Sequence, residues 1–306
     1  MKIYDCFTFY NEFDLLEIRL EELFDHVDYF VISEANTTHS GKPKNFELLD
    51  NWSRVKNFED KIIHIKVADM PGIKKEQRIS PYTGQMEIWD NCWHNERFQR
   101  DALARGLRQG EPEDIMILSD VDELVRPQAV DQIRADMRHT LWAFKMPFFN
   151  YRFNYMWTEP LIYQVQGQAV RLNRASTEFK TCTNIREHYG ANWANRPIDY
   201  DDGNEIALQH SGWHFSSLGS TKMVANKLEN FAHNELAHQA ATIDVDKLIA
   251  EGKTSINPNA KFEPVILDDY FPQTLLKNKE KYEHLILKDA TQTVMSKLEK
   301  VMPYAH

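Results

Sequence analysis

Residues 120–123 (DVDE) place three carboxylates within four positions, directly after an apolar run that ends at Ser119. Such crowding is unfavourable unless a cation relieves the mutual repulsion. A divalent metal can do so, because oxygen ligands suit Mg²⁺ or Mn²⁺ and the ion can bridge to phosphate oxygens. Asp120 and Asp122 would lie on the same side of an extended chain. An acidic turn at the start of the following helix would explain the same residues.

Residues 212–215 (GWHF) place His214 between two aromatic residues in an apolar run. A neutral imidazole at this position could complete a metal shell with Asp120 and Asp122. A core histidine whose hydrogen bonds are satisfied within the protein is the alternative. The sequence leaves both interpretations of His214 open.

Two pairs of cationic residues could bind a diphosphate. Lys42 and Lys44 flank Pro43 in a polar loop, and Arg97 and Arg100 are three residues apart on a predicted helix, hence on one face. Guanidinium and ammonium groups both pair with phosphate oxygens. A solvated loop and helix-surface ion pairs are the alternatives for these residues.

Residues 148–157 (FFNYRFNYMW) are unusually aromatic. Sugars stack on aromatic rings while Asn and Arg side chains bond their hydroxyls, so the segment could contact a glycan. A buried β-strand would need many of the same residues.

The elements that must position these residues alternate between strand and helix. Apolar runs predict strands, and the segments between them predict helices near residues 13–26, 47–58 and 89–107, with a loop over 70–83; the expected strands are residues 2–10, 29–33, 61–67 and 114–119. This alternation predicts α/β architecture with a mostly parallel, Rossmann-like sheet flanked by helices. Ligands of such sheets bind beyond the carboxyl ends of the strands, where the DVDE segment lies.

The second half of the chain is predicted to complete this domain. Residues 141–153 and 160–172 read as strands, 173–209 as irregular, and 221–236 as helix, while 275–300 reads as a charged surface segment. We expect one domain over residues 1–240, with two halves at about 1–125 and about 126–240. Residues 241–306 are expected to form a C-terminal extension that packs on this domain.

The composition excludes several classes of protein. With 46 acidic and 36 basic side chains the net charge is −10, which argues against a nucleic-acid binder. Three widely spaced cysteines indicate reduced thiols in the cytoplasm, and neither a signal peptide nor a transmembrane segment is expected. The absence of G-x-x-x-x-G-K-[ST] and G-x-G-x-x-G motifs disfavours P-loop and dinucleotide-binding enzymes.

Several motifs, taken in order, resemble glycosyltransferase family 17, the β-1,4-mannosyl-glycoprotein β-1,4-N-acetylglucosaminyltransferase family. They are residues 5–12 (DCFTFYNE), 28–36 (DYFVISEAN), 38–44 (THSGKPK), 119–123 (SDVDE), 212–215 (GWHF) and 270–282 (YFPQTLLKNKEKY). The resemblance implies a GT-A fold and an inverting transfer from a UDP-sugar, UDP-N-acetylglucosamine, to a glycan or glycoconjugate acceptor.

The resemblance also implies roles for individual residues. Asp120 and Asp122 would hold Mn²⁺ or Mg²⁺ against the donor diphosphate, with His214 as a further ligand and Lys42 or Arg97 as a second cation. The nucleotide would be bordered by residues at the ends of the first two strands, namely Phe9, Asn11, Glu12 and Glu34. Inversion requires a carboxylate that takes the proton of the acceptor hydroxyl, and the candidates are Glu187, Glu235 and Glu123.

Two other classes of function use the same residues. A metal-dependent nucleotidyltransferase or phosphohydrolase could employ the DVDE carboxylates, and a non-catalytic glycan-binding protein could be built on the aromatic segment. Pyrophosphate release from nucleoside triphosphates would indicate the first. Glycan binding that survives replacement of both Asp120 and Asp122 would indicate the second.

Overall fold

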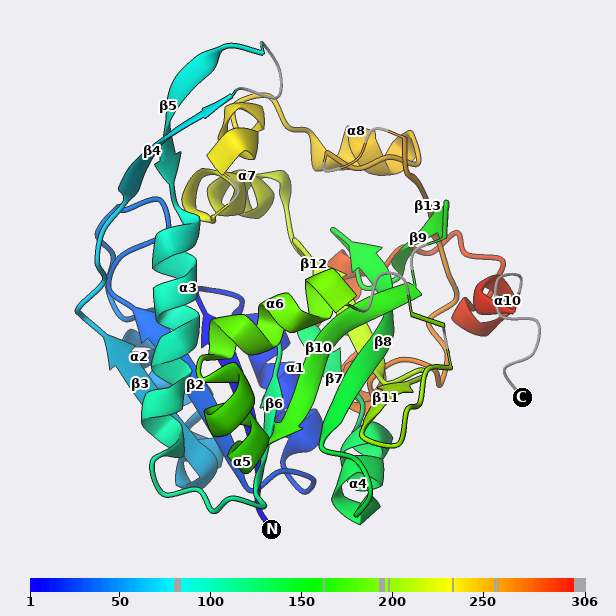
Figure 1. The fold of residues 1–306 in the computed structure, drawn as a ribbon. Helices are drawn as coiled ribbons and strands as arrows, with labels where there is room; N and C mark the ends of the chain where they lie inside the picture. The colour runs from blue at the N-terminus through cyan, green and yellow to red at the C-terminus, as the bar shows by residue number, and fades with distance from the viewer. Residues whose placement is uncertain are drawn as a thin grey trace.

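The computed structural model describes residues 1–79, 84–161, 163–192, 196–197, 199–232, 234–255, 257 and 259–299. Its central feature is a set of four parallel strands in the order β6-β1-β2-β3 (Figure 1). These strands are Ile115–Leu118 (β6), Ile3–Phe9 (β1), Tyr29–Ala35 (β2) and Ile62–Val67 (β3). Because β2 and β3 follow on one side of β1 whereas β6 lies on the other, the strand order reverses between β1 and β6. Ligands bind at such switch points.

The sheet continues beyond β6 with strands of mixed direction. Strand β10 (Tyr163–Arg171) pairs antiparallel with β6 and with β8 (Leu141–Asn150). Strands β9 (Tyr155–Glu159) and β13 (Lys261–Pro264) follow at the edge. Strands β11 (Glu205–Leu208) and β12 (Gly212–Ser216) pair in parallel with β8, and β12 also pairs with β7 (Glu123–Val125). The last of these pairings brings His214 opposite Glu123.

Helices cover both faces of the sheet (Figure 1). Helices α3 (Trp93–Asp101) and α6 (Cys182–Asn192) lie in front of it in this view, and α1 (Phe13–Leu23) lies behind. Helix α7 (Thr221–Asn230) lies above the strand ends, near a hairpin of β4 (Lys74–Ile79) and β5 (Met86–Asn91). The remaining helices are α2 (Glu47–Asp50), α4 (Pro127–Ala135), α5 (Leu172–Arg174), α8 (Val245–Ala250), α9 (Gln273–Lys277) and α10 (Val294–Leu298).

Alternation along the strands divides the core into two layers. In β1, Ile3 and Phe7 pack with α1 residues such as Leu16, whereas Tyr4 and Cys6 pack on the opposite face with residues of α6. The period of two residues along a strand produces this division. The predicted α/β class, with a parallel sheet flanked by helices, is confirmed.

Several predicted elements differ from the structure. The expected loop over 70–83 contains β4, and the helix expected from residue 89 begins at Trp93, because residues 86–91 form β5. The helix expected over 47–58 is the short α2 followed by 3₁₀ turns, and the stretch 173–209 contains α6 and β11. Whether such a polar sequence forms a helix or a strand depends on the elements that pack against it in the folded protein. The local sequence pattern does not reveal these neighbours.

The C-terminal segment was expected on the surface, and this expectation is wrong for its apolar residues. Leu275, Tyr282, Leu285, Val294 and Leu298 are buried in the same cluster as α1 and α4. The first turn of α9 is bound by Glu22 of α1, whose carboxylate accepts from the backbone N–H groups of Gln273 and Thr274. The proposed division at residue 240 remains a prediction.

Candidate active site

The acidic loop after β6 is held by a fully buried arginine, Arg19 of α1. Its guanidinium donates to both carboxylate oxygens of Asp5, at 2.7 and 2.6 Å, and to Ser119 Oγ at 2.7 Å. It also donates to the carbonyl oxygens of Asp120 and Glu123, at 2.8 and 3.1 Å. One side chain therefore ties β1 to the backbone of the whole DVDE segment.

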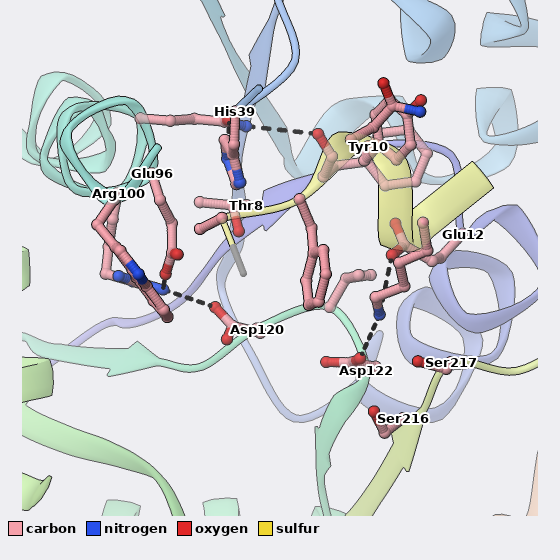
Figure 2. A pocket seen from close by; sticks show the side chains of 18 of the residues that line it. Thr8, Tyr10, Glu12, His39, Glu96, Arg100, Asp120, Asp122, Ser216 and Ser217 are labelled. Atoms are coloured by element: carbon pink, nitrogen blue, oxygen red, sulfur yellow. Dashed lines mark hydrogen bonds and ion pairs between the residues drawn. The ribbon is translucent and has the colours of Figure 1, made fainter. Parts of the chain in front are cut away.

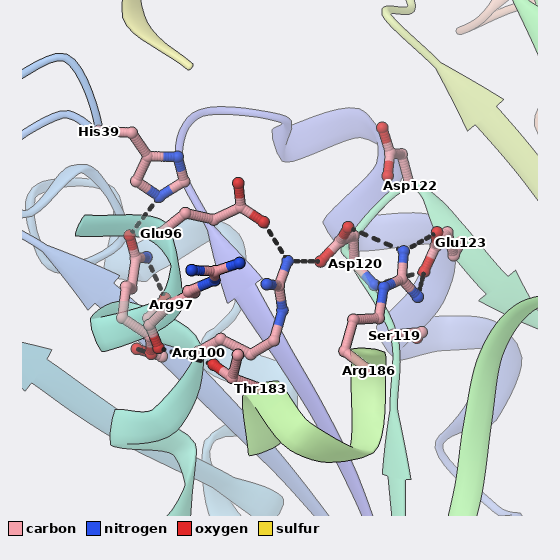
Figure 3. A network of polar contacts seen from close by, with 12 residues as sticks. His39, Glu96, Arg97, Arg100, Ser119, Asp120, Asp122, Glu123, Thr183 and Arg186 are labelled. Carbon is pink, nitrogen blue, oxygen red and sulfur yellow. Dashed lines mark hydrogen bonds and ion pairs between the residues drawn. The ribbon is translucent and has the colours of Figure 1, made fainter. Parts of the chain in front are cut away.

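The carboxylate of Asp120 lies between two arginines (Figure 3). Arg100 of α3 and Arg186 of α6 each lie 3.3 Å from one of its oxygens. Burial alone would raise the pKa of Asp120, but the guanidinium charges of Arg186 and Arg100 outweigh it and hold that pKa well below its usual range. Asp120 therefore stays ionised.

Glu123 lies beneath this pair and does not line the cavity described below. Both of its oxygens accept from Arg186, at 2.8 and 2.5 Å, and Oε2 also accepts from the backbone N–H of Asp120 at 2.8 Å. Burial raises the pKa of Glu123 although Arg186 opposes this effect. With both oxygens bound and 1% of the residue exposed, Glu123 positions the loop and its arginine.

Asp122 faces a different set of groups. Its Oδ2 lies 3.0 Å from Nζ of Lys227 on α7, and its Oδ1 lies 3.9 Å from Nε2 of His214. The same ammonium lies 3.5 Å from Glu12, at the start of α1. Burial opposes the charge on Lys227, but Asp122 and Glu12 outweigh it and raise its pKa. Figure 2 shows the contacts that join Glu12 to Asp122 through this ammonium.

These groups surround one cavity of about 840 Å³ at the carboxyl ends of β1 and β6 (Figure 2). Its cationic side chains come from four separate elements or loops: Lys44, Arg97, Arg100, Arg186 and Lys227. Of the residues predicted from sequence, those that line it are Phe9, Glu12, Lys44, Arg97, Arg100, Asp120, Asp122, Glu187 and His214. The fold thus brings most of the predicted residues to one place.

Glu34 was predicted to border the nucleotide, but it does not line this cavity. It is fully buried and binds His64 Nε2 at 3.0 Å, the backbone N–H of Leu48 at 2.9 Å and Lys44 Nζ at 3.5 Å. Its place at the end of a parallel strand is as expected, yet the side chain points between β3 and α2. There it secures the loop that carries Lys44.

Asn11 and Lys42 also lie outside the main cavity. Asn11 is exposed at the turn before α1, and the Lys42 ammonium lies 3.5 Å from Glu229, with 55% of its side chain exposed. The alternative of a solvated loop therefore describes Lys42, whereas Lys44, two residues further on, enters the site.

The predicted base candidates differ in what surrounds them. Glu187 on α6 lines the cavity, with 53% of its side chain exposed, and pairs with Arg97 at 2.8 Å. Glu235 belongs to a 3₁₀ helix after α7, and its side chain lies outside what the structure describes. Glu187 is thus a described, accessible carboxylate that faces the cavity.

The expected metal ligands are only partly brought together. Within the part of the chain that the structure describes, no group of three or more His, Cys, Asp or Glu side chains is arranged to hold a metal ion. Asp122 and His214 lie close to each other, whereas Asp120 faces the arginines. The buried Nδ1 of His214 has no hydrogen-bond partner among the described residues, so His214 is not the satisfied core histidine of the alternative interpretation.

The aromatic segment divides between core and cavity. Phe149, Tyr151 and Phe153 are fully buried, as a β-core requires, whereas Phe148 and Trp157 line the cavity. The Phe148 ring packs edge-on against Trp157, with centroids 5.6 Å apart, and against His214 at 4.6 Å. An aromatic wall therefore adjoins Asp122.

Several important residues were not identified from sequence. Arg186 and Lys227 stand alone in polar stretches, and no local pattern singles them out. Arg19 carried a signal, since it occupies the apolar face of α1 between Leu16 and Leu23, where a charge requires a buried partner.

Residues 1–257 match the model of glycosyltransferase family 17. The chain belongs to this family. The curated relatives include the β-1,4-mannosyl-glycoprotein 4-β-N-acetylglucosaminyltransferases of Rattus norvegicus and Homo sapiens, both 24% identical over 93% and 90% of this chain. The chain spans about half of their length, 54% and 53% respectively.

Solved structures resemble the chain more distantly. A putative glucose-1-phosphate thymidylyltransferase from Bacillus anthracis is 10% identical with a TM-score of 0.38, covering 80% of this chain and 96% of its own. A Francisella tularensis 2-C-methyl-D-erythritol 4-phosphate cytidylyltransferase is 10% identical with a TM-score of 0.36, covering 68% of this chain and 90% of its own.

None of the described helices is both long and apolar enough to cross a bilayer.

Proposed function

We propose that this family 17 protein is a metal-dependent, inverting glycosyltransferase that transfers N-acetylglucosamine from UDP-N-acetylglucosamine to a glycan hydroxyl. The observation that carries the proposal is the position of Asp120 and Asp122 at the strand switch point, inside a cavity whose walls bring several cations together. The names of the curated relatives support the choice of sugar.

The cations of the cavity suit the donor diphosphate. Asp120 holds both Arg100 and Arg186 in place, together with Glu96 for Arg100 and Glu123 for Arg186. Guanidinium groups that are already oriented bind a phosphate without further loss of side-chain freedom. As the sugar departs, these charges would stabilise the negative charge that develops on the diphosphate.

The residues present fit a divalent metal at Asp122 and His214. Mg²⁺ in nucleotide sites is usually held by one or two protein carboxylates together with substrate phosphates, so a pair of protein ligands suffices. His214 Nε2 lies 3.9 Å from Asp122 Oδ1, so an imidazole nitrogen and a carboxylate oxygen are near enough to share one ion. Bound there, Mn²⁺ or Mg²⁺ would supply Lewis-acid stabilisation of the leaving group.

The transfer itself requires one proton acceptor. The acceptor hydroxyl oxygen forms a bond to the anomeric carbon from the face opposite the diphosphate, and its proton passes to the carboxylate of Glu187. The bond from the anomeric carbon to the phosphate oxygen breaks, and its electron pair leaves with UDP. Attack from the opposite face inverts the anomeric configuration. Phe148 and Trp157, which also line the cavity, offer an aromatic surface for the sugar ring.

The test is to incubate the protein with UDP-N-acetylglucosamine, UDP-glucose, UDP-galactose and GDP-mannose, each with Mn²⁺ or with EDTA. We expect release of UDP from UDP-N-acetylglucosamine with Mn²⁺, accelerated by a mannose-containing glycan and abolished by EDTA. Proton NMR of the product would report the anomeric configuration. Failure to bind or cleave any UDP-sugar would refute the proposal, and retention of configuration would refute its stereochemistry.

A further inference from the structure

His39 and Gln99 form a hydrogen bond at the end of the cavity away from Asp122. Its donor and its acceptor can be identified from the other contacts of Gln99. Gln99 of α3 is buried, and its Nε2 lies 2.9 Å from the carbonyl oxygen of Ser33 and 3.4 Å from that of Phe9. Ser33 lies near the carboxyl end of β2, and Phe9 is the last residue of the neighbouring strand β1. Since carbonyl oxygens only accept, the amide nitrogen of Gln99 must face them.

This orientation determines the tautomer of His39. With Nε2 of Gln99 on the carbonyls, its Oε1 faces His39 Nε2 at 3.0 Å and can only accept. His39 Nε2 therefore carries the proton, and in the neutral ring Nδ1 is an acceptor with a lone pair. Burial lowers the pKa of His39, although Glu96 and Gln99 oppose this, which favours the neutral ring.

The remaining ring nitrogen, Nδ1, has no hydrogen-bond partner among the described residues. His39 itself lines the cavity. Figure 3 shows one ring nitrogen bound to Gln99 and the other turned away from it. The cavity wall thus presents a hydrogen-bond acceptor. Such an acceptor favours a ligand that places an N–H or O–H donor opposite it and disfavours one that places a lone pair there.

The position of His39 fits the base of a nucleotide. It lies on the loop after β2, next to Thr37 and Thr38, which also line the cavity, whereas Asp120 and Asp122 lie on the loop after β6. A nucleotide whose diphosphate occupies the β6 end and which runs across the switch point brings its base to the β2 side.

We propose that Nδ1 of His39 accepts the N3–H of uracil and selects uracil over cytosine. Uracil presents a donor at N3, whereas cytosine presents a lone pair at the same position and would leave two acceptors facing each other. The same acceptor suits thymine, so the chemical class is a pyrimidine with a protonated N3. This assignment rests on the proposed nucleotide-sugar donor and explains how the site would recognise its base.

Calorimetric titration with UDP and CDP tests the assignment, because the two ligands have the same ribose and diphosphate. We expect the wild-type protein to bind UDP about tenfold or more tightly than CDP, since an unpaired buried polar group costs about 1–3 kcal/mol. His39→Leu should weaken UDP binding by a similar factor, leave CDP unchanged and bring the ratio near one. His39→Gln, whose amide can present a donor or an acceptor, should bind both with little preference.

Controls separate this assignment from the wider proposal. His26→Leu, at an exposed histidine that pairs with Asp131, should keep the wild-type ratio, and thermal melting should show that each variant is folded. UDP binding with an unchanged ratio in both folded His39 variants overturns the role of His39 alone. Absence of UDP binding by the wild-type protein overturns the UDP-sugar donor and this role with it.

The tautomer has an independent readout. ¹⁵N NMR of a histidine-labelled sample should place the proton of His39 on Nε2, and UDP, but not CDP, should shift its Nδ1 resonance as a new hydrogen bond forms. A proton on Nδ1 in the free protein overturns the proposal.

Discussion

The two ends of the cavity recognise chemistry in different ways. At the β6 end the side chains are charged and interlocked, so that Asp120 contacts Arg100 and Arg186 while Asp122 contacts Lys227. At the β2 end His39 and Gln99 form a neutral pair, and the hydrogen bond between them determines which atom is a donor and which is an acceptor. Under the proposals above, the charged end would bind the diphosphate of the donor, and the His39–Gln99 pair would distinguish one base from another. Charge would then provide affinity, and hydrogen-bond direction would provide selection.

The largest effect is expected at the charged end. Asp122→Asn keeps the shape of the side chain but removes its charge beside Lys227 and His214, and we expect transfer to fall by about 10²–10³-fold. Initial rates with UDP-N-acetylglucosamine and Mn²⁺ measure it. Asp246→Asn, at an exposed partner of Arg152, should retain full activity. Activity above a tenth of wild type in Asp122→Asn would show that the charged end is not needed for chemistry.

Glu187→Gln tests whether Glu187, which belongs to neither of the two ends compared above, is the proton acceptor. We expect kcat to fall by about 10²-fold with little change in the donor KM, because general-base catalysis acts on the acceptor hydroxyl. Glu178 is a matched control, since it is similarly exposed and pairs with Arg174 as Glu187 pairs with Arg97. Equal rates for Glu187→Gln and Glu178→Gln would exclude Glu187 as the base.

Arg19→Met tests what supports the charged end. Removing the guanidinium leaves the buried Asp5 carboxylate unpaired, so the free energy of unfolding should fall by about 3–5 kcal/mol. Urea denaturation measures it, and adding Asp5→Asn should restore part of the loss. Arg54→Met, at an exposed arginine that pairs with Glu17, should cost less than about 1 kcal/mol. Similar losses at the two arginines would argue against a special role for Arg19.

The smallest effect compares two lysines of one loop. Lys44 lines the cavity with 9% of its side chain exposed, whereas Lys42 faces solvent. Lys44→Met should raise the donor KM by about five- to tenfold through the loss of one charged contact, and Lys42→Met should change it less than about twofold. Steady-state kinetics distinguishes them, and the reverse order would place the donor outside this cavity.

The sequence alone determined the four parallel strands and the chemistry of the residues that follow them. Apolar runs predicted β1, β2, β3 and β6, and therefore also the edge of the sheet at which Asp120 and Asp122 emerge. This succeeds because the strands of a parallel sheet that are covered on both faces, such as β6, are rich in apolar residues. The ordered motifs likewise indicated the family that the match over residues 1–257 confirms.

Only the tertiary structure decided which charges meet. Arg186 and Lys227 reach Asp120 and Asp122 across 66 and 105 residues of chain, and Glu34 turns away from the cavity toward His64. Local pattern specifies where a strand ends, but the partner of a side chain depends on how distant helices pack over that end. The same packing places Gln99 against two strand ends and so determines which nitrogen of His39 accepts a hydrogen bond.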